Sequence, residues 1–291
     1  MNNMSNSSQI EPSVMQNGLA MYSTGEGEPV LLMPYPHMFT TLPIVQSPLG
    51  TLLVKLNRNV ITFDPPGAFR STRPALVTMD EMLECAEETL QAFDIQGAVD
   101  VVGHSMGGLC ALGYTLERPE RVRRLVIVDS LSGGPAVRRH HGVPFHLPWT
   151  DGDFWRLSAW GLRLSYGLGN MAMHKRMLQM LLGFSYVDKS FADDVEILEG
   201  DKQLPAPVRD KWSMTSLRID YRERLGEIRV PTLVCVGRHD LLLPVACSQE
   251  LVDGLPDAQL EIFEESGHDP FREESDKFAE LVGGWINQDN E

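Results

Sequence analysis

Three residues that lie far apart in the sequence have the side chains that nucleophilic catalysis needs: Ser105, Asp240 and His268. A serine hydroxyl is a poor nucleophile at neutral pH, so a neutral imidazole must take its proton during attack and later return it to the leaving group. A carboxylate holds the correct imidazole tautomer and stabilises the imidazolium that forms. We therefore predict Ser105 as nucleophile, His268 as general base and acid, and Asp240 as the acid of a triad.

The context of Ser105 gives this prediction its specificity. Ser105 is the centre of a G-x-S-x-G pattern that follows the apolar run Val99–Val102 and opens a predicted helix over Met106–Glu117. A sharp strand-to-helix turn strains its central residue and needs glycine where a side chain would collide. The Ser105 hydroxyl is therefore predicted at an edge of a sheet, above the positive end of the helix.

Apolar runs with high β propensity alternate with helical segments along most of the chain. The runs are Val30–Met33, Val60–Phe63, Val99–Val102, Leu125–Val128, Leu233–Val236 and Leu260–Phe263. Short strands that are almost entirely apolar and are separated by helices are typical of a mostly parallel α/β sheet covered on both faces. A capping box, Thr78 to Glu81, predicts a helix to about Phe93, and a last helix is predicted over Glu274–Ile286.

The alternation stops between about residues 132 and 224. Helical periodicity there is limited to pieces such as Asp153–Leu164 and Met171–Leu182, so we expect an inserted helical lid over 132–224 within a core of 17–131 and 225–291. Its Trp and Met residues suit an apolar acyl or alcohol pocket above Ser105, and equally ordinary packing of the lid. Residues 1–16 are rich in Asn and Ser and are expected to form a disordered leader.

Several motifs together resemble the α/β-hydrolase superfamily, in particular its lid-bearing serine esterases and lactonases, over about residues 17–288. Besides the elbow, the segment 64–74 is similar to that family's D-x-P-G-x-G-x-S loop, with Phe69 in place of the second glycine. The segment 231–240 followed by Gly267-His268 resembles its C-terminal tail, and the order Ser, Asp, His is the family's order. The resemblance implies an eight-stranded, mostly parallel, doubly covered sheet with an inserted helical lid.

The identity of the acid has two possible answers. Some members of this superfamily carry it after the preceding strand, where this chain has Asp129. Asp240 is the preferred acid because it lies on the turn after an apolar strand near the C-terminus. From sequence alone, Asp240 is also consistent with an ordinary turn residue or a helix N-cap before Pro244.

The oxyanion hole is where this sequence departs from the family. Acyl transfer needs backbone N–H groups aimed at the developing oxyanion, and Met106, the residue after the nucleophile, is predicted to supply one. The family takes the second from a His-Gly-x loop after the third strand, but Pro34 and Pro36 stand in that loop here and have no N–H. Aligning Tyr35-Pro36-His37 on the pattern makes His37 the donor, the alternative being a loop residue that lines the pocket.

Charge and composition exclude several partners. Asp and Glu total 40 against 25 Lys and Arg, a net charge of −15 that disfavours nucleic acid and anionic lipid surfaces. No run approaches a membrane-spanning length, and the four cysteines show no C-x-x-C spacing. His140, His141 and His146 fit no metal-binding spacing. We expect a cytoplasmic enzyme with no metal or organic cofactor, no nucleic-acid partner and no stable membrane insertion.

The predicted function is hydrolysis of a small, largely apolar carboxylic ester or lactone through an acyl-enzyme on Ser105. Three alternatives stay open. Residues 267–273 are similar to the tails of proline iminopeptidases, although their glycine-rich oxyanion loop is absent; a C–C bond hydrolase would use the same triad; and some superfamily members are ligand-binding receptors with slow or no turnover. Dehalogenases and epoxide hydrolases are disfavoured, because they have Asp where this chain has Ser105.

Overall fold

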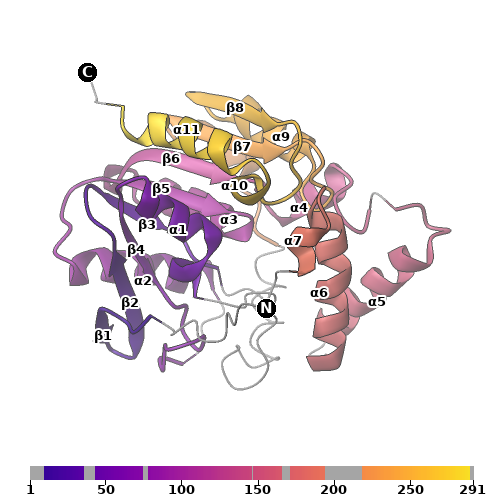
Figure 1. Ribbon diagram of the computed structural model, residues 1–291, viewed down its shortest axis with the longest axis horizontal. Coiled ribbons are helices and arrows are strands. Elements are labelled where there is room, and N and C mark those ends of the chain that lie inside the picture. Colours follow the sequence, from indigo (N-terminus) through magenta and orange to yellow (C-terminus); the bar gives the residue numbers. More distant parts are fainter. Residues whose placement is uncertain are drawn as a thin grey trace, which may run out of the picture.

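The computed structural model describes residues 10–35, 43–74, 78–145, 147–165, 171–193 and 218–288. One eight-stranded sheet with the order β1-β2-β4-β3-β5-β6-β7-β8 runs through it (Figure 1). The strands are β1 Val14–Gln16, β2 Leu19–Thr24, β3 Pro29–Leu32, β4 Asn59–Phe63, β5 Val99–His104, β6 Val122–Val128, β7 Thr232–Gly237 and β8 Ala258–Phe263. All neighbours from β4 to β8 pair in parallel, whereas β1 and β2 are antiparallel. The predicted mostly parallel sheet is confirmed.

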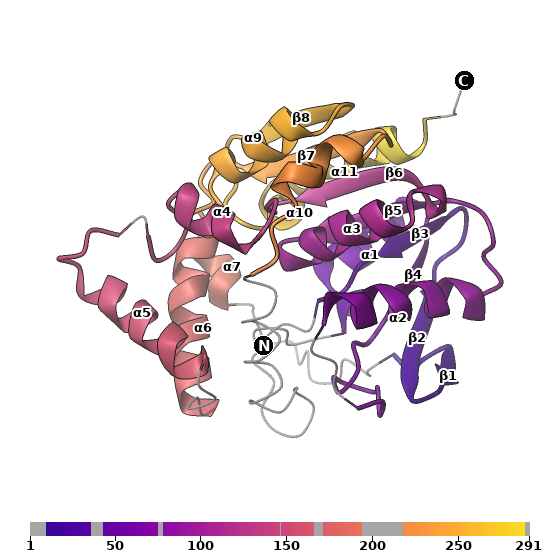
Figure 2. The ribbon, with the colours of Figure 1, turned by 180° about the vertical axis from the view of Figure 1, so that it is seen from behind.

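Helices cover both faces of this sheet. The α-helices in the described residues are α1 Pro48–Lys55, α2 Met79–Ala92, α3 Met106–Glu117, α4 Gly134–Arg139, α5 Gly152–Ser165, α6 Met171–Ser185, α7 Ser190–Asp193, α9 Val245–Gly254, α10 Pro270–Glu273 and α11 Ser275–Ile286. Short 3-10 helices are η1 Ile44–Gln46, η2 Pro119–Arg121 and η3 Arg222–Glu227. α1 and α11 lie on one face and α2, α3 and α9 on the other (Figures 1 and 2).

The continuous apolar character of the central strands follows from this double coverage. Val101 and Leu125 pack in the core on the α2–α3 face, whereas their neighbours Val102 and Val126 pack in the core on the α1–α11 face. All four side chains are fully buried. Because successive residues of a strand point to opposite faces, a strand buried on both sides has no polar position to give it an alternating pattern.

The N-terminal boundary of the core differs from the expectation for residues 1–16. Residues 14–16 form strand β1 and pair with 19–21 of β2, so that end of the expected leader is part of the sheet. Asn17 and Gly18 connect the two strands and both have positive φ, 48° and 75°, as a two-residue hairpin turn requires. The Asn-Gly pair was the signal that would have revealed this hairpin. Residues 1–9 lie outside the described residues.

The segment between β6 and η3 contains helices α4 to α7. Helices α5 and α6 correspond to the predicted pieces 153–164 and 171–182, and both lie at one side of the molecule, away from β1 and β2 (Figure 2). Trp160 packs with Met177 between them, whereas Trp149 and Trp155 are 73% and 59% exposed. These described side chains thus pack helices together or face solvent. Trp212 lies outside the described residues, and the lid bounds 132–224 stay a prediction.

Two further expectations are the lack of a membrane-spanning segment and the lack of paired cysteines. No helix in them combines the length and the apolar character needed to cross a bilayer. All four cysteines are buried and unpaired, and burial raises the pKa of Cys85 to about 11 and that of Cys247 to about 12. These two thiols are therefore protonated at neutral pH and unreactive.

Candidate active site

The predicted nucleophile occupies a strained turn between β5 and α3. Ser105 has φ 55° and ψ −125°, a left-handed conformation that L residues rarely adopt. Its N–H donates to Val128 O (2.9 Å) on β6, and its carbonyl accepts a bond from Ser130 Oγ (2.6 Å). The end of β6 and the segment that follows it thus hold the backbone of Ser105 in place, which leaves its side chain at the carboxyl edge of the sheet.

Glycine at position 103 is required by packing. A Cβ there would lie 2.4 Å from Gly107 O, a backbone atom that cannot move aside. We expect Gly103→Ala to destabilise the protein by roughly 1–3 kcal/mol or more, as overpacking does. The control is Gly284→Ala on the exposed side of α11, where a new Cβ meets nothing within 4 Å and helix propensity predicts a gain of up to about 1 kcal/mol. Urea unfolding of both variants measures the difference, and a Gly103→Ala variant as stable as the wild type would contradict the packing argument.

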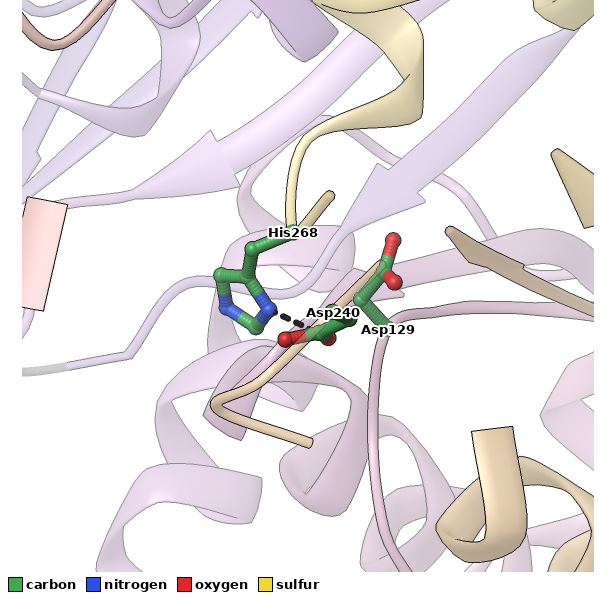
Figure 3. Close-up of side chains that lie close together, drawn as sticks. All are labelled: Asp129, Asp240 and His268. Atoms are coloured by element: carbon green, nitrogen blue, oxygen red, sulfur yellow. Dashed lines mark hydrogen bonds and ion pairs between the residues drawn. The ribbon is translucent and has the colours of Figure 1, made fainter. Parts of the chain in front are cut away.

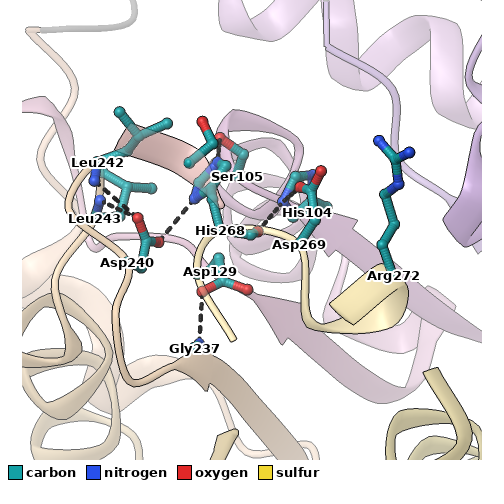
Figure 4. A network of polar contacts seen from close by, with 12 residues as sticks. His104, Ser105, Asp129, Gly237, Asp240, Leu242, Leu243, His268, Asp269 and Arg272 are labelled. Atoms are coloured by element: carbon teal, nitrogen blue, oxygen red, sulfur yellow. Dashed lines mark hydrogen bonds and ion pairs between the residues drawn. The ribbon is translucent and has the colours of Figure 1, made fainter. Parts of the chain in front are cut away.

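The structure brings the three predicted triad side chains together (Figure 4). His268 Nε2 lies 3.0 Å from Ser105 Oγ, and His268 Nδ1 lies 2.7 Å from Asp240 Oδ2. They come from the turns that follow β5, β7 and β8, so the carboxyl ends of parallel strands collect them at one edge of the sheet. All three side chains are at most 9% exposed. The arrangement has the hydrogen-bond geometry of a nucleophile, a base and an orienting acid.

Asp240 performs two structural tasks with its two oxygens. Oδ1 accepts the N–H groups of Leu242 (2.8 Å) and Leu243 (3.0 Å), and Oδ2 faces His268. The backbone bonds fix the carboxylate plane, so Oδ2 has one orientation available. The alternative of a helix N-cap does not describe Asp240, because α9 begins only at Val245 and is preceded by Pro244.

Burial and neighbouring charges act in opposite directions on the base. Burial lowers the pKa of His268, but the charge and hydrogen bond of Asp240, together with the charge of Asp269, outweigh it and leave this pKa above its ordinary value. The neutral imidazole is the form that accepts a proton.

The raised pKa sets the pH dependence of turnover. Since protonation removes the base, kcat/KM should fall on the acid side with a midpoint above about 6.5, the ordinary histidine value. A kcat/KM profile between about pH 5 and 9 in buffers of constant ionic strength measures this midpoint. An acid limb centred well below that value would contradict the assignment of His268.

Asp129, the alternative acid, lies beside the triad, but the hydrogen bond that it accepts comes from the backbone and not from the base. Its Oδ1 accepts the N–H of Gly237 (2.9 Å), while His268 Nδ1 is bonded to Asp240 (Figure 3). Asp129 has φ 42° and is fully buried. The geometry therefore favours Asp240 as the orienting acid and leaves Asp129 a buried carboxyl group with another task.

The two predicted oxyanion donors have different standing. Met106 is the first residue of α3 and directly follows Ser105, so its N–H has no acceptor within the helix. This position fits the predicted role. His37 lies outside the described residues, and its role as second donor stays a prediction.

The loop that resembles D-x-P-G-x-G-x-S keeps its backbone shape despite the change from glycine. Phe69 has φ 47°, the left-handed conformation that glycine favours. Asp64 Oδ2 accepts from Tyr22 Oη (2.7 Å) and from the Arg70 N–H (3.0 Å), and Ser71 Oγ donates to the Asp64 carbonyl (2.6 Å). These bonds hold the loop in a conformation that is unfavourable for phenylalanine.

His104, for which no catalytic role was predicted, packs against the ring of the base and bonds to its backbone. Its Nε2 donates to the His268 carbonyl (2.9 Å), and the two imidazole rings lie 4.8 Å apart. Burial, with the nearby His268, lowers the pKa of His104 to about 4, so it is neutral and can donate. Its position directly before the nucleophile was the available signal.

Helix α6 also contacts the histidine loop. The N–H of His268 donates to Ser185 O (2.6 Å), at the C-terminal end of α6. The carboxylate of Glu273 accepts the N–H of Gly267 (2.6 Å) with one oxygen and that of Val187 (2.7 Å) with the other. The contacts of His268 with Ser185 and of Glu273 with Val187 join segments more than 80 residues apart, so no local sequence pattern indicates them.

In the Arg138–His141 segment, Arg138 and Arg139 form the C-terminal end of helix α4, and His140 follows directly. His140 Nε2 lies 2.7 Å from Glu250 Oε2, and Arg139 pairs with the same carboxylate. His146 lies outside the described residues. Among the described residues, Asp129, Asp240 and His268 form the one group whose possible metal-ligand atoms lie within 4.8 Å of one another. Two of these three residues are the predicted acid and base of the triad.

Comparison with known proteins identifies the class. The model of the alpha/beta hydrolase fold matches residues 43–275, and the chain belongs to this family. A 2-hydroxy-6-oxononadienedioate/2-hydroxy-6-oxononatrienedioate hydrolase of Cupriavidus pinatubonensis is 31% identical over 199 residues, which span 66% of this chain and 63% of that relative. A 2-hydroxymuconate semialdehyde hydrolase of Pseudomonas sp. is 30% identical over 98% of this chain and 97% of its own length. A hydrolase structure from Bacillus anthracis superposes with a TM-score of 0.74 at 20% identity, covering 91% of this chain and 94% of that one.

Proposed function

We propose that the protein is a serine hydrolase that cleaves a small, largely apolar carboxylic ester or lactone through an acyl-enzyme on Ser105. One observation carries this proposal: Ser105 Oγ lies 3.0 Å from His268 Nε2, while Asp240 Oδ2 lies 2.7 Å from Nδ1 of the same ring. This geometry suits a hydroxyl that loses its proton to a neutral imidazole as it attacks a carbonyl carbon.

The proposed cycle uses each group in turn. Ser105 Oγ bonds to the carbonyl carbon while His268 Nε2 takes its proton, and the Met106 N–H donates to the oxyanion. His268 then gives this proton to the leaving alkoxide, and the acyl group stays on Ser105. Water then enters and its oxygen bonds to the acyl carbon while His268 Nε2 takes one of its protons. The bond from that carbon to Ser105 Oγ breaks, His268 gives the proton to Oγ, and the carboxylic acid leaves. Asp240 stabilises the imidazolium in both halves of the cycle.

A C–C bond hydrolase is a second candidate. The names of the relatives from Cupriavidus pinatubonensis and Pseudomonas sp. specify oxo-dienoate or semialdehyde substrates that carry no ester. Hydrolysis of such a compound breaks a carbon–carbon bond, and the fragment that departs takes its proton on carbon. The same three residues of this chain would supply the nucleophile and the proton.

A substrate panel separates these candidates. It compares p-nitrophenyl esters of two, four and eight acyl carbons, a six-membered lactone, 2-hydroxymuconate semialdehyde and proline p-nitroanilide. The proposal predicts the highest kcat/KM for a short ester or the lactone, with a burst of p-nitrophenolate equal to the enzyme concentration if deacylation is slower. A higher kcat/KM for the semialdehyde would replace the ester proposal with C–C hydrolysis, and covalent labelling of Ser105 without useful turnover would favour a ligand-binding receptor.

A further inference from the structure

Asp129 is a buried carboxyl group next to the triad that the proposed cycle does not use. It terminates β6, its N–H donates to Cys235 O (2.8 Å), and its Oδ1 accepts from the N–H of Gly237 (2.9 Å) on β7. Its other oxygen, Oδ2, is buried and has no N–H or O–H donor among the described residues. A buried carboxylate oxygen without a donor is costly, so a proton on this oxygen is the simplest way to satisfy it.

Asp240 is the neighbouring carboxylate that could accept a hydrogen bond from a proton on Asp129. One carboxylate oxygen of Asp129, one of Asp240 and one ring nitrogen of His268 all lie within 4.8 Å of one another (Figure 3). Two ionised carboxylates this close in a buried site repel each other, and one proton held between them removes that repulsion. Asp240 accepts three N–H groups, from Leu242, Leu243 and His268, whereas Asp129 accepts one. Because N–H donors stabilise the ionised form, the charge resides on Asp240 and the proton on Asp129.

Resting on the proposed function, we propose that Asp129 is a neutral carboxylic acid that donates its proton to Asp240 and positions the Asp240 carboxylate against His268. The pair then presents one negative charge to the imidazole. That charge is matched to the single positive charge of the imidazolium formed during acylation. Asp129 acts through Asp240 and is therefore a positioning residue.

The electrostatics of the pair agree with this arrangement. Burial raises the pKa of Asp129 well above its ordinary value, and the charge of Asp240 and a hydrogen bond to it raise it further, against the opposing N–H of Gly237. The titratable groups that face Asp129 are Asp240 and Asp269 from the acid and histidine turns, His268 itself, and the Cys235 thiol of β7.

The protonation state of Asp129 is tested by titrating His268. Side-chain NMR of the histidine ring in the wild type and in Asp129→Asn gives the pKa of His268 without requiring turnover. Asparagine keeps an acceptor for Gly237 and a donor for Asp240. If Asp129 is neutral, no charge is lost, and the pKa of His268 stays within about 0.3 units of the wild type. If Asp129 is ionised, removing its charge lowers that pKa by about one unit or more, which would overturn the proposal.

Asp269→Asn is the matched control for this titration. The charge of Asp269 raises the pKa of His268, so its removal should lower that pKa. The control shows that the measurement detects the loss of one nearby carboxylate. The NMR result stands even if no substrate is found, so failure of the proposed function and failure of this inference are separate outcomes.

Kinetics test the positioning role. Asp129→Ala removes the donor, and we expect kcat on the best ester to fall by about 10- to 100-fold with little change in KM, as loss of an outer-shell partner does at other sites. Asp129→Asn should restore kcat to within a few-fold of the wild type. Equal losses in both variants, or wild-type kcat in Asp129→Ala, would overturn the role. Circular dichroism and thermal unfolding of both variants show whether an equal loss arises from misfolding, and the Asn titration still decides the protonation state in that event.

Discussion

Replacing Ser105 with alanine is expected to lower kcat by about 10⁶-fold, because the change removes the hydroxyl that forms the acyl-enzyme and leaves no nucleophile in its place. The Ser105 side chain makes one of the two hydrogen bonds of the His268 ring, and the backbone bonds of His268 do not depend on it. The fold therefore loses little, because the Ser105 backbone stays bonded to Val128 O and to Ser130. Initial rates on the best substrate of the panel, with active-site titration of the wild type, measure the effect.

Ser248→Ala is the matched control for the nucleophile. Ser248 is fully buried on α9, and its hydroxyl has no hydrogen-bond partner among the described residues. The variant loses the same atom from a similarly buried site and should keep wild-type kcat. A Ser105→Ala variant that keeps more than about a tenth of the wild-type kcat would remove Ser105 from the mechanism.

Replacing Asp240 with asparagine is expected to lower kcat by about 10⁴-fold. An amide at this position can turn its NH₂ toward His268 and favour the tautomer that cannot accept the Ser105 proton. The bonds from Leu242 and Leu243 to the remaining oxygen would persist, so the loop keeps its shape. Steady-state kinetics and thermal unfolding on the same preparations measure both effects.

Asp129→Asn is the variant to compare with Asp240→Asn, and it should lower kcat far less. Asp129 is bonded to Gly237 rather than to His268. Asp253→Asn, an exposed change on α9, controls for the general effect of removing a charge. If Asp129→Asn cost more activity than Asp240→Asn, the acid would be Asp129.

The central sheet was predictable because its residues are buried on both faces. The run Leu125–Val128 has no polar member, and Val99–Val102 has only one, the buried Asp100. Helix α3 ends at Glu117, as predicted. The N-terminal hairpin was missed because its strands are short, and β1 has no apolar periodicity. β1 depends on pairing with β2, and β2 pairs with β4, about 40 residues later in the chain.

The candidate site was predictable only as far as local patterns reach. A turn after a strand that carries Ser105, Asp240 or His268 is visible in the sequence, and the parallel sheet then brings the three together. Both Asp129 and Asp240 follow apolar strands, so the sequence pattern does not separate them. The structure does, because it shows which carboxylate bonds to the His268 ring. The support of His268 by His104 and by Ser185 of α6 depends on loop packing that no local spacing encodes.

Covalent labelling tests the central claim, a nucleophilic Ser105 activated by His268, most directly. Wild-type protein and Ser105→Ala are treated with a fluorophosphonate at pH 8, measured by intact-protein mass spectrometry, and digested to locate the adduct. The wild type should gain one phosphonyl group, located on Ser105, and Ser105→Ala should gain none. An unmodified wild type, or an adduct on another residue, would contradict the account.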